Sequence, residues 1–384
     1  MKTKKINVLL SALIVLLVAW AFSSCSKSDN APAPPSKAAL NAEITTAVNL
    51  KSTTTEGVGT GQYAIGSQAT LQTAINAAQA VASNVSATKD QITAATAQLT
   101  AAVTAYQAAI VVPIAAADMV GQWTFDEITS AVVGTTVKDY SGNGHNGTLQ
   151  AGHAYWSTTA GYPYATYPAP ATNIPTIATD RYGNQHALHF LAGSNVQIPY
   201  SAALNPQTAI TISLWAKADT LPNQASYKYY ANNYMVALSR WNGYKFQFQD
   251  TPRAFFTVDH DGTNYDNQDN NATITSLTKW LHYAVTFTSG TMSFYINGQL
   301  TYSWTTASET GGLVLLNGVA GTNTAPVDLV FGQDLPTSAY STNSSAPNYL
   351  NYGGYFIGSL DDVRIYKAAL SATQILSIYN AEKP

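Results

Sequence analysis

The chain has 384 residues, with 18 Lys and Arg against 21 Asp and Glu, which gives a formal net charge of −3. Only 10% of the residues are charged, against about 25% in an average globular domain. This balance excludes a basic nucleic-acid-binding protein, because such proteins cluster Lys and Arg against phosphate groups. The single cysteine excludes an intramolecular disulfide and any Cys-x-x-Cys motif.

Residues 1–25 have the pattern of a secretory signal. A basic M-K-T-K-K start leads into an apolar run over residues 6–22, and two serines then precede Cys25. A cysteine at this place resembles the lipobox of bacterial lipoproteins, which implies a signal peptide cleaved before Cys25 and lipid on its thiol. We therefore predict a lipid anchor in the bacterial outer membrane, exposed at the cell surface, because several acyl chains hold a protein stably at a membrane. A plain secretory peptide and an uncleaved anchor are the alternatives.

Residues 26–36 form a Pro-rich linker, and residues 37–112 form an Ala-rich block with apolar residues at helical spacing. The pattern predicts helices near 37–55, 67–83 and 87–110, with Ser86 or Thr88 as the N-cap of the third. Three amphipathic helices of this size make a small bundle. The block resembles FIVAR domains, which are helical repeats found beside carbohydrate-active modules. We expect a stalk without a ligand of its own.

From residue 118 the pattern changes to alternating apolar and polar residues with turn residues between the runs, as in 209–217 and 281–287. Asn297 and Gly298 separate two such runs and predict a tight hairpin, because they tolerate positive φ. The region predicts an antiparallel β-sandwich, interrupted by loop-like insertions at 150–185, 219–233 and 333–353.

Four landmarks follow one another in this region: residues 120–127, residues 139–149, residues 210–217 followed by 280–286 and the hairpin, and residues 358–366. The series resembles LamG-like, concanavalin A-like lectin/glucanase jelly rolls of bacterial surface proteins. The resemblance covers nearly all of 118–384. It implies a mainly β fold, with two packed antiparallel sheets, one of them concave, closed by pairing of the first and last strands.

The resemblance also implies a structural Ca²⁺, because many relatives carry one between the strand ends, with an aspartate at the position of Asp361. Asp126, Asp139 and Asn143 are the accompanying candidates, since Ca²⁺ takes six to eight oxygen ligands. The alternative is that Asp139 supports an Asx-turn and that Asp362 pairs with Arg364.

Ligand-binding candidates come from aromatic-rich insertions and one acidic stretch. Sugar rings stack on aromatic faces, while Asp, Asn and Gln bond their hydroxyl groups. The stretch at 259–269 lacks the Gly and Glu spacing of an EF-hand and fits a loop or part of a sugar site better. The alternative is that the tyrosines pack the loops as a second core. The candidates are Tyr155, Trp156, Tyr164, Tyr229, Tyr230, Trp241, Asp259, Asp261 and Tyr349.

Catalysis is not expected. Glycosidases need two carboxyl groups across the scissile bond, and laminarinase-type enzymes on this fold carry Glu-x-Asp-x-Glu, which the chain lacks. Its glutamates in this region are Glu127, Glu309 and Glu382. We therefore expect a monomeric lectin-like lipoprotein whose partner is a glycan and which contacts the membrane only through its lipid. The alternatives are a structural or adhesive module that binds protein, and a lyase or hydrolase with an unrecognised site, for which His260 and His282 are available.

Overall fold

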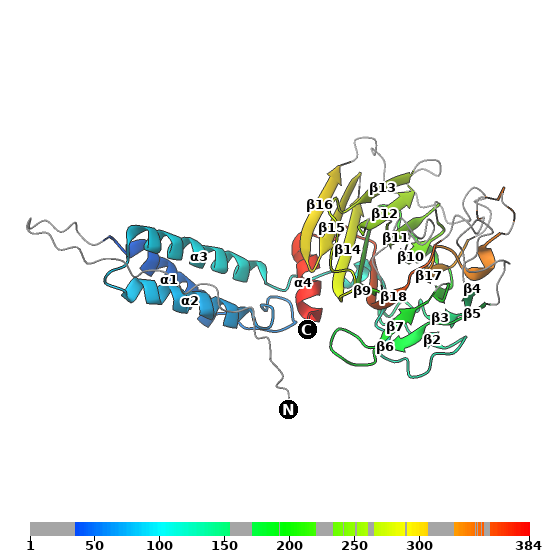
Figure 1. Ribbon diagram of the computed structural model, residues 1–384, viewed down its shortest axis with the longest axis horizontal. Coiled ribbons are helices and arrows are strands. Elements are labelled where there is room, and N and C mark those ends of the chain that lie inside the picture. The colour runs from blue at the N-terminus through cyan, green and yellow to red at the C-terminus, as the bar shows by residue number, and fades with distance from the viewer. Residues whose placement is uncertain are drawn as a thin grey trace, which may run out of the picture.

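In the computed structural model, the described residues are 35–153, 171–191, 193–219, 233–240, 242–249, 252–259, 265–288, 290–305, 326–341, 343, 345, 346, 348 and 354–384. They form an elongated helical bundle joined to a β-sandwich (Figure 1). Within these ranges, none of the helices has both the length and the apolarity to cross a membrane. The predicted signal peptide and Cys25 lie outside the described residues.

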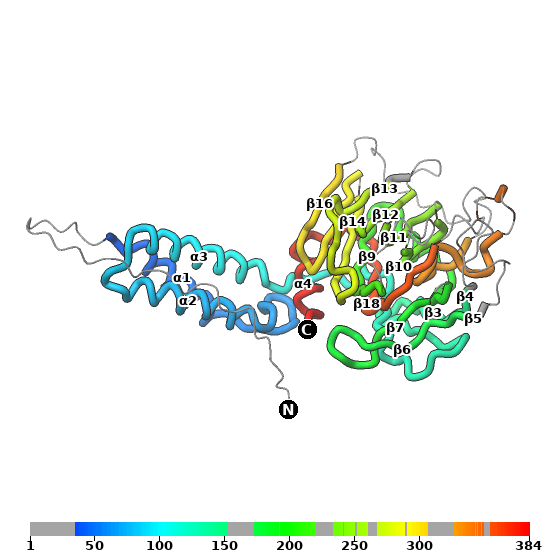
Figure 2. Tube along the Cα trace, in the orientation of Figure 1, coloured from blue at the N-terminus to red at the C-terminus, as the bar shows by residue number. Residues whose placement is uncertain are grey.

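The bundle consists of α1 (Ala38–Ser52), α2 (Ser67–Ser83) and α3 (Lys89–Ala108), close to the predicted positions. Thr88 is the N-cap of α3 and forms a capping box with Gln91. Each helix contributes a stripe of Leu, Ile and Ala to one shared core. Because the number of helices is odd, α1 begins at the end farthest from the sandwich and α3 ends beside it (Figure 2). The bundle therefore separates residue 35 from the sandwich by about 30 Å, the length of a 20-residue helix.

The sandwich has two eight-stranded sheets within the described residues. We call the sheet that contacts the C-terminal helix the proximal sheet, and the other the distal sheet. The proximal sheet has the order β16 (Gln299–Thr305), β15 (Thr291–Ile296), β14 (Leu281–Thr288), β9 (Ala209–Ala218), β18 (Gly358–Tyr366), β7 (Ala187–Phe190) and β6 (Thr176–Ala178), with β1 (Met119–Trp123) paired to β18.

The distal sheet has the order β13 (Tyr265–Asp269), β12 (Ala254–Asp259), β11 (Tyr244–Phe248), β10 (Asn233–Leu238), β17 (Leu329–Phe331), β8 (Asn195–Ile198), β3 (Gly147–Gln150) and β2 (Thr136–Val137). A separate pair consists of β4 (Gly152–His153) and β5 (Ala171–Asn173). Three short 3₁₀ turns are η1 (Ala116–Asp118), η2 (Ala202–Leu204) and η3 (Thr337–Ala339).

This arrangement confirms the predicted antiparallel jelly roll. The first strand β1 pairs with the last strand β18 in antiparallel register, from Met119↔Tyr366 to Trp123↔Val363. Alternate residues of both sheets point inward and make one large apolar core that includes Trp123, Leu214, Phe246 and Val285. The period-two pattern of the sequence therefore places one face of each sheet in this core.

The C-terminal helix α4 (Ala372–Glu382) lies on the outer face of the proximal sheet, where Tyr379 stacks on Trp215. It also holds the segment that joins the bundle to the sandwich. The Ser377 hydroxyl donates to the Ile110 carbonyl at 3.2 Å and accepts from the Val112 N–H at 3.1 Å. The bundle and the sandwich are therefore linked through α4 as well as through the chain itself.

The predicted hairpin turn is present, with Asn297 and Gly298 at φ 49° and 74° between β15 and β16. A Cβ at Gly298 would lie 2.9 Å from atoms of Leu376 and Tyr379 in α4. We expect Gly298→Ala to lower the free energy of unfolding by about 2–4 kcal/mol, from backbone strain at positive φ plus overpacking.

The matched control for this prediction is Gly142→Ala, because Gly142 has φ 86° and open space around its Cβ position. The Gly142→Ala variant should introduce only the backbone strain, and should lower the free energy of unfolding by about 1–2 kcal/mol. Urea denaturation of both variants gives the comparison. Equal losses would contradict the packing of α4 against the hairpin.

Candidate functional site

The outer face of the distal sheet is polar, in contrast to its inner face. On β11, Tyr244, Phe246 and Phe248 point into the core, so the alternate residues Lys245 and Gln247 lie on the outer face. The register continues this face through Thr257 of β12, which pairs with Lys245. It extends in the other direction to Asn195 and Gln197 of β8. We call this surface the polar face.

The polar face is covered rather than open. Lys245, Gln247, Thr257 and Asn195 are at most 2% exposed. Part of the cover is the segment after β17, where the Thr337 hydroxyl accepts a hydrogen bond from the Asn195 side-chain amide at 3.2 Å. Polar side chains buried at this depth need hydrogen-bond partners.

Beside the polar face lies a fully buried ion pair. Nε of Arg240 is 2.6 Å from Oδ2 of Asp334, and neither side chain is exposed. The Tyr340 hydroxyl donates to the other oxygen of Asp334. Burial lowers the pKa of Lys245 well below its ordinary value, although Asp334 opposes this shift. Burial therefore favours the neutral amine of Lys245, which lies 5.3 Å from the centre of the Tyr234 ring.

Oxygen atoms on this face include two that have no hydrogen-bond partner among the described residues. They are Oδ1 of Asn195 and Oγ1 of Thr257, and both residues are fully buried. The Asn195 amide already uses its NH₂ group on Gly193 and Thr337, so that side chain retains only an acceptor. A water molecule or a ligand hydroxyl group is the natural donor to such an atom.

Of the predicted ligand-binding residues, Asp259 is described. It is the last residue of β12, two positions after Thr257, and its side chain therefore belongs to the polar face, where it is 2% exposed. The other predicted ligand-binding residues lie outside the described residues; they are Tyr155, Trp156, Tyr164, Tyr229, Tyr230, Trp241, Asp261 and Tyr349.

Two of the predicted metal ligands stabilise the turn after β2. The Asp139 carboxylate accepts hydrogen bonds from the backbone N–H groups of Gln122, Ser141 and His145 at 2.8–3.0 Å. Burial opposes the ionised form, but these bonds outweigh it and lower the pKa of Asp139. Asn143 donates its side-chain amide to backbone carbonyls of β1. This is the Asx-turn alternative, and it leaves the Asp139 oxygens engaged with N–H donors.

Asp361 is held by an arginine. Nη1 of Arg181 lies 2.5 Å from its Oδ2, and the N–H of Asp362 donates to its Oδ1 at 2.9 Å. Asp362 also pairs with Arg364 at 3.3 Å, as the alternative predicted. Asp126 is more than half exposed and lies 3.6 Å from Nδ1 of His186.

The four predicted metal ligands are each engaged in other contacts. Asp139 and Asn143 hold the turn after β2, whereas Asp361 pairs with Arg181. Among the described residues, no group of three or more His, Cys, Asp and Glu side chains has the arrangement of a metal site. The carboxylates of Asp139 and Asp361 accept bonds from N–H donors, whereas Ca²⁺ needs those oxygens for itself. This arrangement does not fit the calcium site that the resemblance implied.

Residues 191–376 match the family model of the concanavalin A-like lectin/glucanases superfamily. The matched residues lie within the β-sandwich and its C-terminal helix. No curated protein sequence matches the chain.

Several solved structures are similar to part of this chain. The binding domain of Paraclostridial Mosquitocidal Protein 1 has 16% identity and a TM-score of 0.45, over 69% of this chain and 52% of that chain. Domain 4 of AbnA, a GH43 extracellular arabinanase from Geobacillus stearothermophilus in complex with arabinotriose, has 16% identity and a TM-score of 0.43, over 68% of this chain and 98% of that chain. Botulinum neurotoxin type C, whose cell entry depends on interaction with two ganglioside molecules, has 13% identity and a TM-score of 0.40. The match covers 69% of this chain and 51% of that chain. The chain thus spans about half the length of the two toxin chains.

The superfamily includes glucanases, so the candidate catalytic groups matter. Glu382 is the last residue of α4, where its side chain accepts a hydrogen bond from Trp215, and His282 lies beneath that helix on the outer face of the proximal sheet, across the sandwich from the polar face. Burial lowers the pKa of His282 to about 3, and its Nε2 is 2.8 Å from the Ser213 hydroxyl, so it remains a neutral core residue. Glu127 accepts the Lys138 N–H at 2.6 Å. Glu309 and His260 lie outside the described residues.

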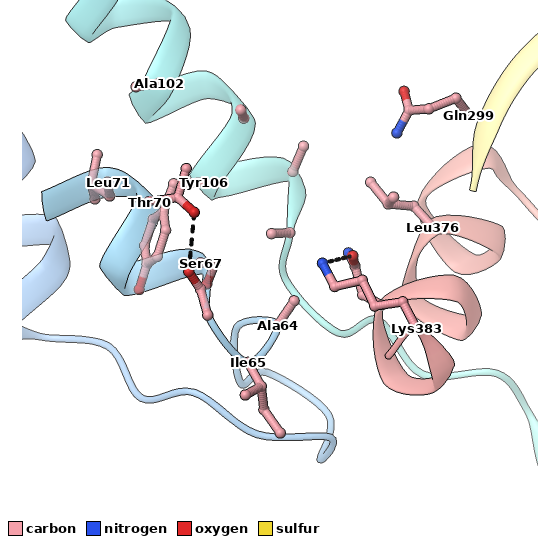
Figure 3. A pocket seen from close by; sticks show the side chains of 15 residues that line it. Ala64, Ile65, Ser67, Thr70, Leu71, Ala102, Tyr106, Gln299, Leu376 and Lys383 are labelled. Atoms are coloured by element: carbon pink, nitrogen blue, oxygen red, sulfur yellow. Dashed lines mark hydrogen bonds between the residues drawn. The ribbon is translucent and has the colours of Figure 1, made fainter. Parts of the chain in front are cut away.

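A cleft of about 480 Å³ lies between the bundle and α4 of this lectin/glucanase-type domain (Figure 3). Alanines of α3, together with Leu71 and Leu376, form apolar parts of its walls. Lys383 is the charged residue that lines it, and its Nζ donates to Asn380 at 2.9 Å. The N-terminus of α2 opens nearby, but Glu56 accepts the Gln68 N–H there. The cleft is lined by a mixture of small apolar and polar side chains, and no site is assigned to it.

The sequence interpretation missed the polar residues in the strands and the ion pair beside them. Lys245 and Gln247 could have been found from the alternation Y-K-F-Q-F, which puts two polar side chains opposite three core aromatics. Nothing in the local sequence pairs Arg240 with Asp334, because 94 residues separate them.

Proposed function

We propose that this chain is a non-catalytic, lectin-like surface lipoprotein that binds a glycan at the polar side of the distal sheet. The observation that carries the proposal is the polar face itself. It presents amides, hydroxyls and a lysine on a sheet whose other face is core, and its Asn195 and Thr257 retain oxygen acceptors. Sugars are rich in the O–H donors that such acceptors require.

The position of the aromatic-rich segments supports the same proposal. Residues 220–232 join β9 to β10, and residues 260–264 join β12 to β13, so both connect directly to strands of the distal sheet. Tyr229 and Tyr230 of the first segment, and Asp261 of the second, are therefore tethered to strands that carry the polar face. The match to the model of a superfamily that includes lectins is consistent with this proposal.

The linker and the helical bundle would determine how the sandwich is held relative to the membrane. If Cys25 is lipidated, the linker and the bundle place the sandwich away from the membrane. The bundle is joined through α4 to the proximal sheet, so the polar side of the distal sheet faces away from the bundle (Figure 1). Labelling with a fatty-acid analogue, lost in Cys25→Ala, tests the anchor.

Thr257→Val tests the glycan site. The change removes an unpartnered hydroxyl at nearly constant volume, so we expect thermal stability to stay equal or rise. Because Thr257 is fully buried under the covering segment, the proposal requires that segment to move aside when the glycan binds. We then expect affinity for the bound glycan to fall about tenfold, the loss of one hydrogen bond of about 1.4 kcal/mol. A glycan array, run in Ca²⁺ and again in EDTA, identifies the polysaccharide, and calorimetry compares the variants.

The matched control is Thr305→Val on the exposed edge strand β16, which should bind as the wild type does. Unchanged binding by Thr257→Val would move the site away from the polar face. Binding to no glycan by the folded protein would refute the lectin-like function.

One observation favours a second candidate, a structural or adhesive module that binds protein. The polar face is covered, and buried networks such as Arg240–Asp334 hold the covering segment in place. A sandwich whose concave side is filled by its own chain supports a scaffold role. A folded protein that binds no glycan but is cross-linked to a neighbouring surface protein would establish this alternative.

A further inference from the structure

The acidic site on β18 is neutralised by a side chain of the same protein. Arg181 lies in the turn between β6 and β7, and its side chain is only 4% exposed. Nη1 and Nη2 lie 2.5 and 2.6 Å from the carboxylates of Asp361 and Asp362. Nε donates to the carbonyl of Glu382 at 2.6 Å. One guanidinium thus joins the β6–β7 turn, the last strand and the end of α4.

The surroundings of Arg181 are built for a planar cation. Its guanidinium carbon lies 4.6 Å from the centre of the Trp215 ring and 4.5 Å from that of Tyr182. Such aromatic faces stabilise a guanidinium by cation–π contact. The two carboxylates and the carbonyl lie along its fixed fork of donors, a geometry that lysine does not provide.

The charges of the cluster show what Arg181 contributes. Asp361, Asp362 and the Glu382 side chain are three buried carboxyl groups, and Arg364 is the other cation, 3.3 Å from Asp362. Asp126 and Asp180 lie close enough to add their negative charge to the field at Asp361. Without Arg181, three buried carboxyl groups would face one guanidinium. Loss of one partner from a buried ion pair is strongly destabilising, because the remaining charge is left uncompensated.

We propose that the Arg181 guanidinium is the built-in cation of this site, and that it makes folding of the sandwich independent of Ca²⁺. A hard divalent ion would need the same carboxylate oxygens that now accept the Arg181 N–H groups. The arginine also connects segments that a bound metal could otherwise connect, because each of its three nitrogens donates a hydrogen bond to a different residue of β18 or α4. This inference is independent of whether the chain binds glycan.

Thermal unfolding of the purified full chain, in Ca²⁺ and in EDTA, is the first test. The wild type should unfold at the same temperature in both. Arg181→Ala should lower the unfolding temperature by roughly 10 °C. Arg253→Ala is the matched control, because Arg253 pairs with Asp269 at 2.9 Å in a partly exposed position and should change little.

Terbium luminescence is the second readout. Tb³⁺ is a Ca²⁺ analogue, and Trp215 beside the site can sensitise it. We expect a Trp-sensitised signal from Arg181→Ala, in which the carboxylates are released, and none from the wild type. If Arg181→Ala does not fold, Arg181→Lys replaces it in the thermal test. It should unfold at a lower temperature than the wild type and the Arg253→Ala control, because lysine lacks the fork of donors. Destabilisation of the wild type by EDTA, a Tb³⁺ signal from the wild type, or equal stability of Arg181 and Arg253 variants would overturn the proposal.

Discussion

Replacing Asp334 by Asn is expected to lower the free energy of unfolding by about 3–5 kcal/mol, because it leaves the Arg240 guanidinium buried without its counter-charge. Both side chains of this pair are fully buried, with Nε and Oδ2 2.6 Å apart. The asparagine keeps the shape of the aspartate, so the loss reports the charge rather than a cavity. Urea denaturation at neutral pH measures it.

Asp269→Asn is the matched control for this prediction. Asp269 pairs with Arg253 at 2.9 Å, but these side chains are 20% and 30% exposed. An ion pair in contact with water contributes at most about 1 kcal/mol. Comparable losses in the two variants would show that Arg240 reaches solvent in the folded protein, contrary to the structure.

The stability of the sandwich is expected to fall as the pH rises from about 5 to about 8. Burial, together with nearby Asp362, raises the pKa of Asp361 from 3.8 to about 8, and burial raises that of Glu382 from 4.5 to about 7. The folded chain therefore keeps a proton over a pH range in which the unfolded chain has released it. This stabilisation is complete below the unfolded pKa values and is lost as the pH rises through the folded ones.

The size of the effect follows from the charges of the cluster. Three carboxyl groups share the two guanidinium groups of Arg181 and Arg364, so we count one retained proton. A shift of about two to three pKa units corresponds to roughly 3 kcal/mol. Denaturation curves at pH 5, 6, 7 and 8 measure it, and Glu382→Gln should flatten the dependence. A free energy of unfolding that rises across this range would contradict the assignment.

Local sequence determined much of the architecture. Ala-rich segments with helical spacing place α1, α2 and α3, and Thr88 caps α3 because its hydroxyl satisfies an N–H that the helix leaves open. Alternation along β9 and β14 predicts strands with one buried face; the strands are present, but both of their faces are buried. The Asn297–Gly298 pair specifies its turn through positive φ. These helices, strands and turns depend on interactions between residues close together in the chain. They can therefore be predicted without knowledge of the tertiary structure.

The candidate sites depended on contacts between distant residues. Asp361 was predicted as a metal ligand, whereas its carboxylate accepts a hydrogen bond from Arg181, which lies 180 residues away in the sequence. Nothing near Asp361 in the sequence distinguishes a metal ligand from half of an ion pair. The glycan-binding candidates on the aromatic-rich insertions stay predictions, because they lie outside the described residues. Asp259, on β12, is the candidate that the described residues include.

The sequence by itself determined the helices, the strands, the tight turn and, through its landmarks, the jelly roll. Only the tertiary structure decided that α4 covers the proximal sheet, that the polar face is covered, and that arginines neutralise the buried carboxylates. The physical reason is the range of the forces involved. Backbone propensity and periodic burial act over a few residues, whereas the neutralisation of a buried charge depends on whichever distant segment the folded chain brings beside it.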